Sequence, residues 1–380
     1  MADAKNDKKP ADTPFKQQRL AAWQPIMSPL YVVGCFLFIA VAFIPIGVVV
    51  VIASGEIVEV EAKYSDPVCT WGASTFVRDD NNIPASPGAA VNPFGTNFSK
   101  SVGCSKTVSL KVDRAMKAPV YLYYKLTNFY QNHRRYANSR VDSQIAGLTN
   151  DVGSECDPIK GFTTETGAVT YSPCGLIAWS MFNDSAKLFQ VNTDNTRTLI
   201  CNTEGFYADG TPNVTAAGSC VKIGIAWDSD RDKKFQPPKN LNDNILTGNG
   251  IKSSRNYFAR NGYYNNEAGH RVPLVTDEDT MVWFRTASLP NFRKLWRKIN
   301  KDLPVGSYEI EVTDRFDTSA FSGKKSIVLA TTSWIGGKNE FLGVAYIVVG
   351  ALCFVLSVGF FVKHKISGDR PSGVDIFAKN

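Results

Sequence analysis

Histidine is scarce in this chain of 380 residues, which contains only His133, His270 and His364. No C-x-x-C pair is present either. Histidine is the usual general base near neutral pH, and closely spaced cysteines hold structural zinc or carry out thiol redox chemistry. A histidine-dependent hydrolase, a zinc site and a thioredoxin-type redox centre are therefore all poorly supported.

Motifs for phosphate binding and nucleophilic catalysis are missing as well. The chain has no G-x-x-x-x-G-K-[ST] loop, no D-K-T-G phosphorylation motif and no G-x-S-x-G elbow. Asp228, Asp230 and Asp232 alternate as in a calcium loop, but the glycine and the final bidentate glutamate of an EF-hand are absent, so we expect a surface acidic turn. The sequence predicts a protein that is not an enzyme and needs no cofactor.

Charged residues make up 20% of the chain, but two long segments, Leu30–Ile52 and Phe341–Val362, contain none. A helix of roughly 20 apolar residues crosses a bilayer. We therefore predict two transmembrane helices rather than buried core helices, with Pro45 tolerated inside the first. The first segment is longer than the apolar core of a signal peptide, about 7–15 residues, and follows a polar leader, which favours an uncleaved anchor.

Basic residues close to these segments predict the orientation. The leader before the first segment is basic, and the tail opens with Lys363, His364 and Lys365, whereas Glu56 and Glu340 flank the opposite ends. By the positive-inside rule both termini are cytoplasmic. The predicted parts are a cytoplasmic leader (1–29), a first transmembrane helix (30–52), a lumenal or extracellular ectodomain (53–340), a second transmembrane helix (341–362) and a cytoplasmic tail (363–380).

Six of the eight cysteines lie in the predicted ectodomain, namely Cys69, Cys104, Cys156, Cys174, Cys201 and Cys220. An even set in one compartment predicts disulfides in an oxidising space. Six cysteines allow 15 pairings, of which the sequence-neighbour pairs are the least demanding; six buried free thiols are the alternative. The ectodomain also carries three N-x-[ST] sequons, which predict N-glycosylation at Asn97, Asn183 and Asn213.

Short β-like runs separated by turn residues dominate the ectodomain. Tyr308–Val312, for example, alternates polar and apolar residues, as a half-buried strand does. We predict a β-rich, antiparallel sandwich-like α+β ectodomain, disulfide-bonded and anchored by two transmembrane helices. Apolar residues three and four apart in Leu289–Ile299 predict an amphipathic helix, with a basic face that is solvated or touches lipid headgroups. A second helix is expected over Phe129–Arg140, where Asn132–Arg135 is either an anion site or part of a capped surface helix.

Two spans are too few to form a transport pathway within one chain, and these two hold no ionisable residue that would mark an ion relay. Small residues in the spans suit close helix packing against a membrane partner: Gly34, Gly47, Gly343, Ala345, Gly350 and Gly359. The compartment and the charge distribution disfavour nucleic acid as a partner. The residues thus predict a two-span glycoprotein that acts by contact.

Six longer motifs, in one order along the chain, identify a family. They are F-K-Q-Q-R-L-A-A-W-Q-P (Phe15–Pro25), F-I-P-I-G (Phe43–Gly47), N-F-Y-Q-N-H-R-R-Y (Asn128–Tyr136), P-C-G-L-I-A-W-S-M-F-N-D-S (Pro173–Ser185), V-W-F-R-T-A-S-L-P-N-F-R-K-L (Val282–Leu295) and S-W-I-G-G-K-N-E-F-L-G (Ser333–Gly343). With them the chain resembles the cell division control protein 50 / ligand-effect modulator family, the accessory beta subunits of type IV P-type ATPases, which are phospholipid flippases.

The resemblance implies a non-catalytic subunit that an ATPase needs for folding, for exit from the endoplasmic reticulum and for moving phospholipid to the cytoplasmic leaflet. The implied partners are that catalytic subunit, as a heterodimer, and membrane lipids. The implied locations are the endoplasmic reticulum, Golgi or endosomal membranes and the plasma membrane. The family pattern pairs Cys69 with Cys104 and Cys156 with Cys174, leaves the pairing of Cys201 with Cys220 open, and favours a glycan at Asn183.

The leader is expected to run along the cytoplasmic membrane surface and to meet the ATPase there, through Phe15, Lys16, Arg19 and Trp23. Two other classes of function remain open on the residues alone. One is a two-span receptor or adhesion glycoprotein that acts without an ATPase, and the other is a membrane-anchored ectoenzyme.

Overall fold

The computed structural model describes residues 12–17, 29–65, 104–148, 152–164, 167–206, 212–213, 216–239, 245–247, 274–316 and 318–367. The chain forms two compact units. One comprises Met1–Ser54 and Asn339–Asn380, and the other comprises Gly55–Lys338. Each is described on its own below.

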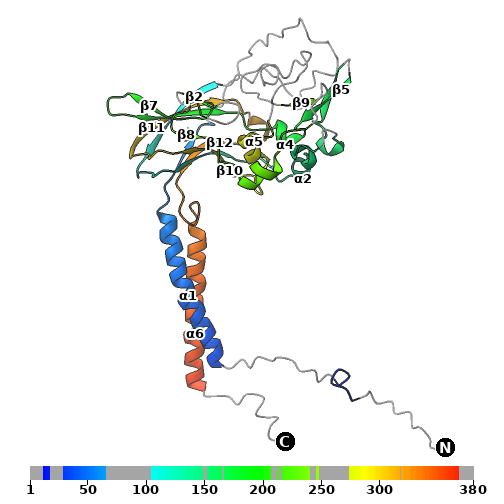
Figure 1. Cartoon of the computed structure of the whole chain (residues 1–380). Helices are drawn as coiled ribbons and strands as arrows, with labels where there is room; N and C mark the ends of the chain where they lie inside the picture. The colour runs from blue at the N-terminus through cyan, green and yellow to red at the C-terminus, as the bar shows by residue number, and fades with distance from the viewer. Residues whose placement is uncertain are drawn as a thin grey trace, which may run out of the picture. The chain divides into compact units, whose positions relative to one another are not determined.

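Two long helices lie side by side in the first unit (Figure 1): α1 (Pro29–Gly55) and α6 (Glu340–Ser367). Both are long and apolar enough to cross a membrane. Each extends beyond the uncharged segment that predicts it, and α6 continues through Lys363, His364 and Lys365. The basic last turn suits a helix C-terminus, because cations there are favoured by the helix dipole.

The second unit is built on two antiparallel sheets. One has five strands in the order β1 (Glu59–Lys63), β12 (Lys325–Ala330), β3 (Val120–Leu126), β10 (Phe292–Ile299) and β8 (Cys220–Val221). The other has four in the order β2 (Cys104–Val112), β11 (Gly306–Asp314), β6 (Ser185–Val191) and β7 (Arg197–Asn202). A small third sheet contains β4 (Gly161–Thr164), β5 (Gly167–Ser172) and β9 (Ile245–Thr247), with β5 and β9 parallel.

One hydrophobic core joins the two larger sheets. Every second residue of β3 and of β11 is buried, which is the period of a strand with one face in a core. Leu122 and Leu126 from one sheet share a cluster with Leu188, Tyr308 and Ile310 from the other. The β-rich, antiparallel sandwich-like ectodomain predicted from the sequence is thereby confirmed.

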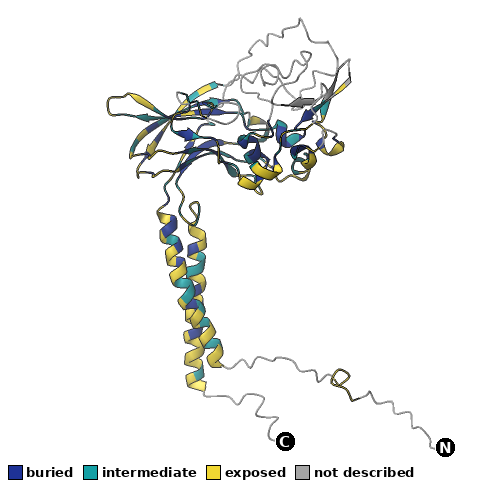
Figure 2. Cartoon of the chain, in the orientation of Figure 1, coloured by how far each residue is buried: buried dark blue, intermediate teal, exposed yellow. Residues whose placement is uncertain are grey.

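Short helices and turns lie beside the sheets (Figures 1 and 2). They are α2 (Arg134–Ala137), α3 (Asp142–Ile145), α4 (Leu176–Trp179), α5 (Glu278–Phe284), the 3₁₀ turns Ser154–Cys156 and Ser319–Phe321, and a π turn at Asp230–Lys234. α2 covers only four residues of the helix predicted over Phe129–Arg140.

The amphipathic helix predicted for Leu289–Ile299 is wrong, because Phe292–Ile299 forms β10. This strand pairs with β3 on one side and β8 on the other, and a register shift between Leu295 and Arg297 places Lys294, Trp296 and Arg297 all in buried positions. The apolar spacing that resembles a helix arises from this irregularity. Two of the basic residues, Lys294 and Arg297, are therefore buried in the ectodomain, and Arg293 and Lys298 are half-buried.

The prediction of a surface acidic turn at Asp228–Asp232 is correct for two of its three carboxylates. Asp228 and Asp232 are exposed and both pair with Arg231. Asp230 is buried and pairs with Arg285 at 2.5 Å. In the part of the chain that the structure describes, no group of three His, Cys, Asp or Glu side chains could hold a metal ion.

Candidate interaction sites

The contact between α1 and α6 is lined by small residues at intervals of seven. Ala40, Gly47 and Ser54 are the small buried residues at this spacing in α1, and Gly343, Gly350 and Ser357 are those in α6. A seven-residue period is the signature of two helices that coil around each other. In Figure 2 the buried residues of both helices lie on the sides that face each other.

Backbones approach closely at these glycines. A Cβ atom added to Gly47 would lie 2.8 Å from the carbonyl oxygen of Gly343, and one added to Gly350 would lie 2.8 Å from Cγ1 of Ile44. The hydroxyl of Ser357 donates a hydrogen bond to the carbonyl oxygen of Val33 at 3.1 Å. Three of the glycines expected to contact a membrane partner, Gly47, Gly343 and Gly350, thus pack within the chain itself.

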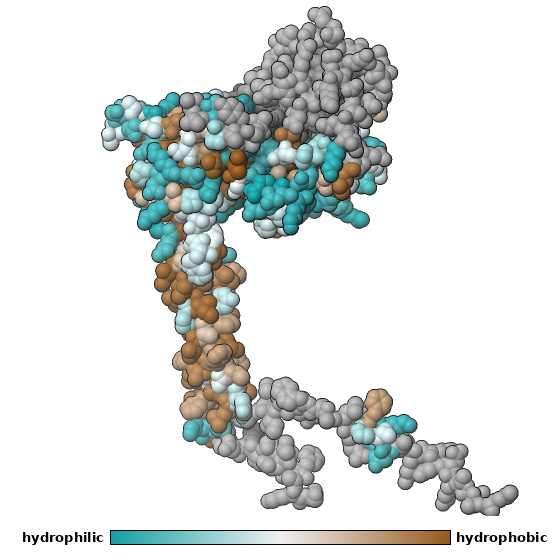
Figure 3. Space-filling view, viewed as in Figure 1, coloured by the Kyte–Doolittle hydropathy of each residue, from teal (hydrophilic) through white to brown (hydrophobic). Residues whose placement is uncertain are grey.

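Two other glycines of the helices, Gly34 and Gly359, lie away from that contact, since an added Cβ at either would meet no atom within 4 Å. Gly34 lies in a shallow groove of about 400 Å³ whose other lining residues are Leu30, Tyr31, Cys35 and Phe38. Figure 3 shows that the visible surface of the helix pair is hydrophobic along its length. This outer surface is available to lipid or to another helix.

Of the leader residues expected to contact a partner, the structure describes Phe15 and Lys16, whereas Arg19 and Trp23 lie outside the described residues. Thr13 opens a single turn in which its carbonyl oxygen accepts from the Gln17 amide at 2.9 Å and its hydroxyl accepts from the Lys16 amide at 3.3 Å. This turn leaves the Phe15 side chain 76% exposed.

Disulfides join Cys156 to Cys174 and Cys201 to Cys220. Both disulfides join cysteines that are neighbours in the sequence, as expected. The family resemblance left the pairing of Cys201 with Cys220 open, and the structure shows that these two cysteines are bonded. Cys104 is also disulfide-bonded, and its expected partner Cys69 lies outside the described residues. The two cysteines of the helices, Cys35 and Cys353, are free.

Two of the three sequons lie within the described residues. Asn183 is half-buried and is followed at once by Asp184 and by Ser185, the first residue of β6. The amide of Asn213 donates to the carbonyl oxygen of Gly205 at 3.0 Å. Asn97 lies outside the described residues.

The middle residue of the second sequon, Asp184, belongs to a buried charge cluster. Lys325 of β12 contacts Asp184 at 2.8 Å and also Asp314 of β11. The Tyr64 hydroxyl donates to Asp184 at 2.7 Å, and Lys106 pairs with Asp314 at 3.0 Å. Buried charges are tolerated only when paired, so this cluster fixes how the edges of the two sheets meet.

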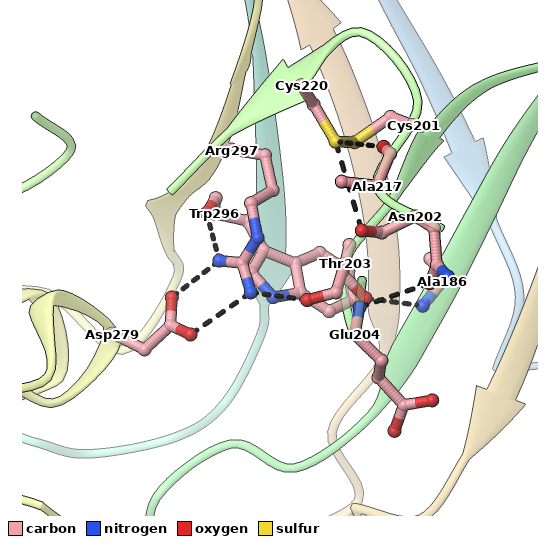
Figure 4. Close-up of a disulfide and its surroundings, with 10 residues drawn as sticks. All are labelled: Ala186, Cys201, Asn202, Thr203, Glu204, Ala217, Cys220, Asp279, Trp296 and Arg297. Carbon is pink, nitrogen blue, oxygen red and sulfur yellow. Dashed lines mark hydrogen bonds and ion pairs between the residues drawn. A yellow bond between two sulfur atoms is a disulfide. The ribbon is translucent and has the colours of Figure 1, made fainter. Parts of the chain in front are cut away.

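A second buried cluster ties α5 to β10 (Figure 4). Arg297 reaches from β10 to Asp279 with Nη1–Oδ1 at 2.7 Å and Nη2–Oδ2 at 3.1 Å, and Nη2 also donates to the Thr203 carbonyl at 2.5 Å, close to the Cys201–Cys220 disulfide. Lys222 contacts the same carboxylate at 2.9 Å. Burial alone would raise the pKa of Asp279, but the charges of Arg297 and Lys222 outweigh it and hold that pKa well below its usual range.

Lys294 is buried without a carboxylate. Its ammonium donates to the carbonyl oxygens of Val282 and Trp283, each at 3.0 Å, and to that of Arg285 at 2.5 Å. Burial lowers the pKa of this amine to about 7. The three acceptors lie at and just beyond the C-terminus of α5, where carbonyls lack helical partners, so Lys294 holds this helix on the sheet.

These features define a class: an integral membrane protein with a disulfide-bonded β-sandwich ectodomain and a pair of apolar helices. Residues 50–370 match the model of the LEM3 (ligand-effect modulator 3) family / CDC50 family. The chain belongs to this family.

Relatives of similar length exist in plants, animals and fungi. The chain is 37% identical to ALA-interacting subunit 3 of Arabidopsis thaliana, over 97% of this chain and 90% of the relative. It is 35% identical to cell cycle control protein 50A of Bos taurus, over 94% and 90%. It is 31% identical to the phospholipid-transporting ATPase accessory subunit CRF1 of Saccharomyces cerevisiae, over 95% and 86%.

Proposed function

We propose that this chain is the non-catalytic accessory subunit of a phospholipid-flipping type IV P-type ATPase. The observation that carries the proposal is the family match over residues 50–370, together with nearly full-length relatives named as an accessory subunit of a phospholipid-transporting ATPase and as ALA-interacting subunits. The chain supports the folding of the ATPase, its exit from the endoplasmic reticulum, and its transfer of phospholipid to the cytoplasmic leaflet. The catalytic residues and the lipid path belong to the ATPase.

The physical basis is differential contact. A subunit without a reaction of its own can shift the conformational equilibrium of an ATPase only if it binds some of its states more tightly than others. An ectodomain with a packed core and disulfides suits this role, because a surface that is ordered before binding loses little entropy on association. The outer groove at Gly34 and the free face at Gly359 give the anchor a surface for a neighbouring helix.

The topology and the site residues form part of the same proposal. Both termini are cytoplasmic, and residues 53–340 lie in the lumen of the endoplasmic reticulum, Golgi or endosomes, or outside the cell. Cys69 pairs with Cys104, glycans occupy Asn97, Asn183 and Asn213, and Phe15, Lys16, Arg19 and Trp23 contact the ATPase. Supporting observations are the five disulfide-bonded cysteines among the described residues of the ectodomain and the exposed ring of Phe15.

Co-purification tests the proposal. The full-length chain and a type IV P-type ATPase are expressed together and separately, and the complex is isolated in mild detergent through a tag on this chain. We expect one-to-one co-purification, phospholipid-stimulated ATP hydrolysis by the complex, and retention of the singly expressed ATPase in the endoplasmic reticulum. A chain that purifies without the ATPase, and whose omission leaves ATPase location and turnover unchanged, would point instead to a receptor or adhesion protein.

A further inference from the structure

Most of the arginine side chains in the described part of the ectodomain are engaged. Within the described part of Gly55–Lys338, ten arginines are present, and eight of these side chains donate a hydrogen bond or form an ion pair. The eight are Arg114, Arg140, Arg197, Arg231, Arg285, Arg293, Arg297 and Arg315. Arg134 and Arg135, adjacent in α2, are both exposed, and neither side chain has a partner within the described residues.

These two arginines extend a surface formed by two loops, 128–133 and 286–291. The Phe129 amide donates to the Pro290 carbonyl at 3.0 Å, the Asn132 side-chain amide donates to the Ser288 carbonyl at 2.9 Å, and the Ala287 amide donates to Gln131 Oε1 at 3.0 Å. We call six of the exposed residues in these loops and in the first turn of α2 the arginine surface: Tyr130, Asn132, His133, Arg134, Arg135 and Leu289.

Large apolar side chains stand among these polar groups. Tyr130 is 55% exposed and Leu289 is 69% exposed. Exposed apolar groups rimmed by cations are typical of protein interfaces, where tyrosine and arginine contribute much of the binding energy.

Buried contacts beneath the two loops hold the backbone of the arginine surface in one conformation. Gln131 is fully buried, and the ring of Phe129 packs edge-on against those of Tyr136 and Phe321. Asn128 adopts a left-handed backbone with φ of 58°, and its side chain donates to the Phe321 carbonyl. The backbone that carries Tyr130 and the arginines is therefore ordered before any partner arrives, which reduces the entropy cost of binding.

Among the described residues, no carboxylate pairs with Arg134 or Arg135. Residues 128–141 and 286–291 contain no aspartate or glutamate, and the next carboxylate, Asp142, pairs with Arg140 at 3.0 Å. The guanidinium groups of Arg134 and Arg135 repel each other. Each presents N–H donors in one plane, which can donate two parallel hydrogen bonds to the two oxygens of a carboxylate. The chemistry that would complete this surface is a pair of carboxylates beside an apolar side chain.

We propose that the arginine surface binds an acidic segment in an exoplasmic loop of the partner ATPase, with carboxylates on Arg134 and Arg135 and an apolar side chain between Tyr130 and Leu289. This inference rests on the proposed function. A protein segment fits better than a membrane for two reasons. The loops have a fixed shape, and the negative surface potential that attracts basic clusters belongs to the cytoplasmic leaflet, whereas the ectodomain is assigned to the opposite side.

Charge reversal tests the arginines in the co-expressed full-length complex. R134E/R135E is expected to lower the yield of co-purified ATPase by about tenfold, which corresponds to about 1.4 kcal/mol. K111E/K187E makes the same change of charge at exposed positions of β2 and β6 and is expected to leave the yield within about twofold. R134K/R135K keeps the positive charges but removes the planar guanidinium groups, and its yield of co-purified ATPase is expected to lie between those of the other two variants. Thermal unfolding and non-reducing electrophoresis of each variant check that the ectodomain is folded.

Photo-crosslinking identifies the occupant. Benzoylphenylalanine at position 130 is expected to crosslink to an exoplasmic ATPase loop containing aspartate or glutamate, as read by mass spectrometry of the adduct. A phospholipid adduct, or no adduct while the complex remains intact, overturns the proposal, as does a folded R134E/R135E variant that co-purifies normally. If the wild-type chain itself fails to co-purify, it is the proposed function that fails, so the two failures are distinguishable.

Discussion

At the scale of single residues, the ectodomain is organised by buried cations that each have a different kind of partner. Lys325 contacts two carboxylates, and Arg297 shares one carboxylate with Lys222. Lys294 donates to backbone carbonyls and lies over the rings of Trp283 and Phe292. Removing one member of such a set leaves an uncompensated buried charge, which costs far more than an exposed ion pair contributes. Folding stability should therefore respond sharply at these residues.

Asp279→Asn is the clearest test. At neutral pH we expect a loss of about 3–5 kcal/mol, because Arg297 and Lys222 lose their shared charge. Since the pKa of Asp279 is lowered in the fold, the unfolded chain takes up this proton first as the pH falls. The stabilisation is thus complete above the unfolded pKa, near 3.9, and is lost as the pH falls below it towards the folded pKa. Denaturation of the purified full-length protein between pH 7 and pH 3 measures both effects.

Asp228→Asn is the matched control, because the Asp228 side chain is 84% exposed and pairs with Arg231 at 2.8 Å. Its effect should stay below about 1 kcal/mol and should depend little on pH. A difference between wild type and Asp279→Asn that stays constant down to pH 3 would contradict the assigned role of the carboxylate.

At the scale of elements, strands with one buried face were predictable and the strand with buried cations was not. Tyr308–Val312 lies in β11, where strict alternation makes the buried face visible in the sequence. In β10 the register shift breaks the alternation, and burial of Lys294 and Arg297 contradicts the rule that cations face water. The acidic run Asp277–Asp279, which supplies the carboxylate partner of Arg297, is the one hint in the sequence that a cation is buried nearby. This run lies outside β10, so the pattern of the strand itself does not reveal it.

The helix pair shows the same limit. Composition predicts two apolar helices and their small residues, but not which glycines contact which neighbour. Gly47, Gly343 and Gly350 pack inside the pair, whereas Gly34 and Gly359 remain on its outside. The glycines inside the pair follow a seven-residue spacing, with Ala40 and Gly47 in α1 and with Gly343, Gly350 and Ser357 in α6. Gly34 and Gly359 do not fit this spacing, which distinguishes the two groups.

Leucine substitutions at Gly350 and Gly359 test this division. The Cβ of a leucine at position 350 would overlap Ile44 and push the helices apart, whereas a Cβ at position 359 meets no atom within 4 Å. Cysteines placed at Phe43 and Tyr346, whose rings lie 5.1 Å apart, report the pairing by oxidative crosslinking. With Cys35 and Cys353 replaced by alanine, we expect Gly350→Leu to abolish the crosslink and Gly359→Leu to retain it. Loss of the crosslink in both variants would contradict the packing.

At the scale of the whole molecule, the net charge of +7 is distributed as the proposed topology requires. The leader is basic, the tail opens with Lys363 and Lys365, and the ectodomain between them carries nearly balanced charge over most of the chain. Positive charge kept on one side of two apolar helices orients both helices at insertion. The leader thereby has two proposed roles: its basic residues orient the helices in the membrane, and its aromatic residues contact the ATPase. Substitutions that change one set of residues and leave the other intact can separate these roles.

Phe15→Ala/Trp23→Ala keeps every positive charge of the leader and removes two aromatic rings. Because orientation depends on lysine and arginine, the double variant should insert normally, with the same glycan pattern as wild type. Contact with a partner depends on apolar area, and burying two aromatic rings contributes several kcal/mol, so we expect weaker retention of the ATPase and lower lipid-stimulated turnover. Lys16→Gln/Arg19→Gln is the reciprocal variant, and retention of both properties by both variants would show that the leader makes no contact. Endoglycosidase digestion and co-purification, measured on the same membranes, read out the two roles separately.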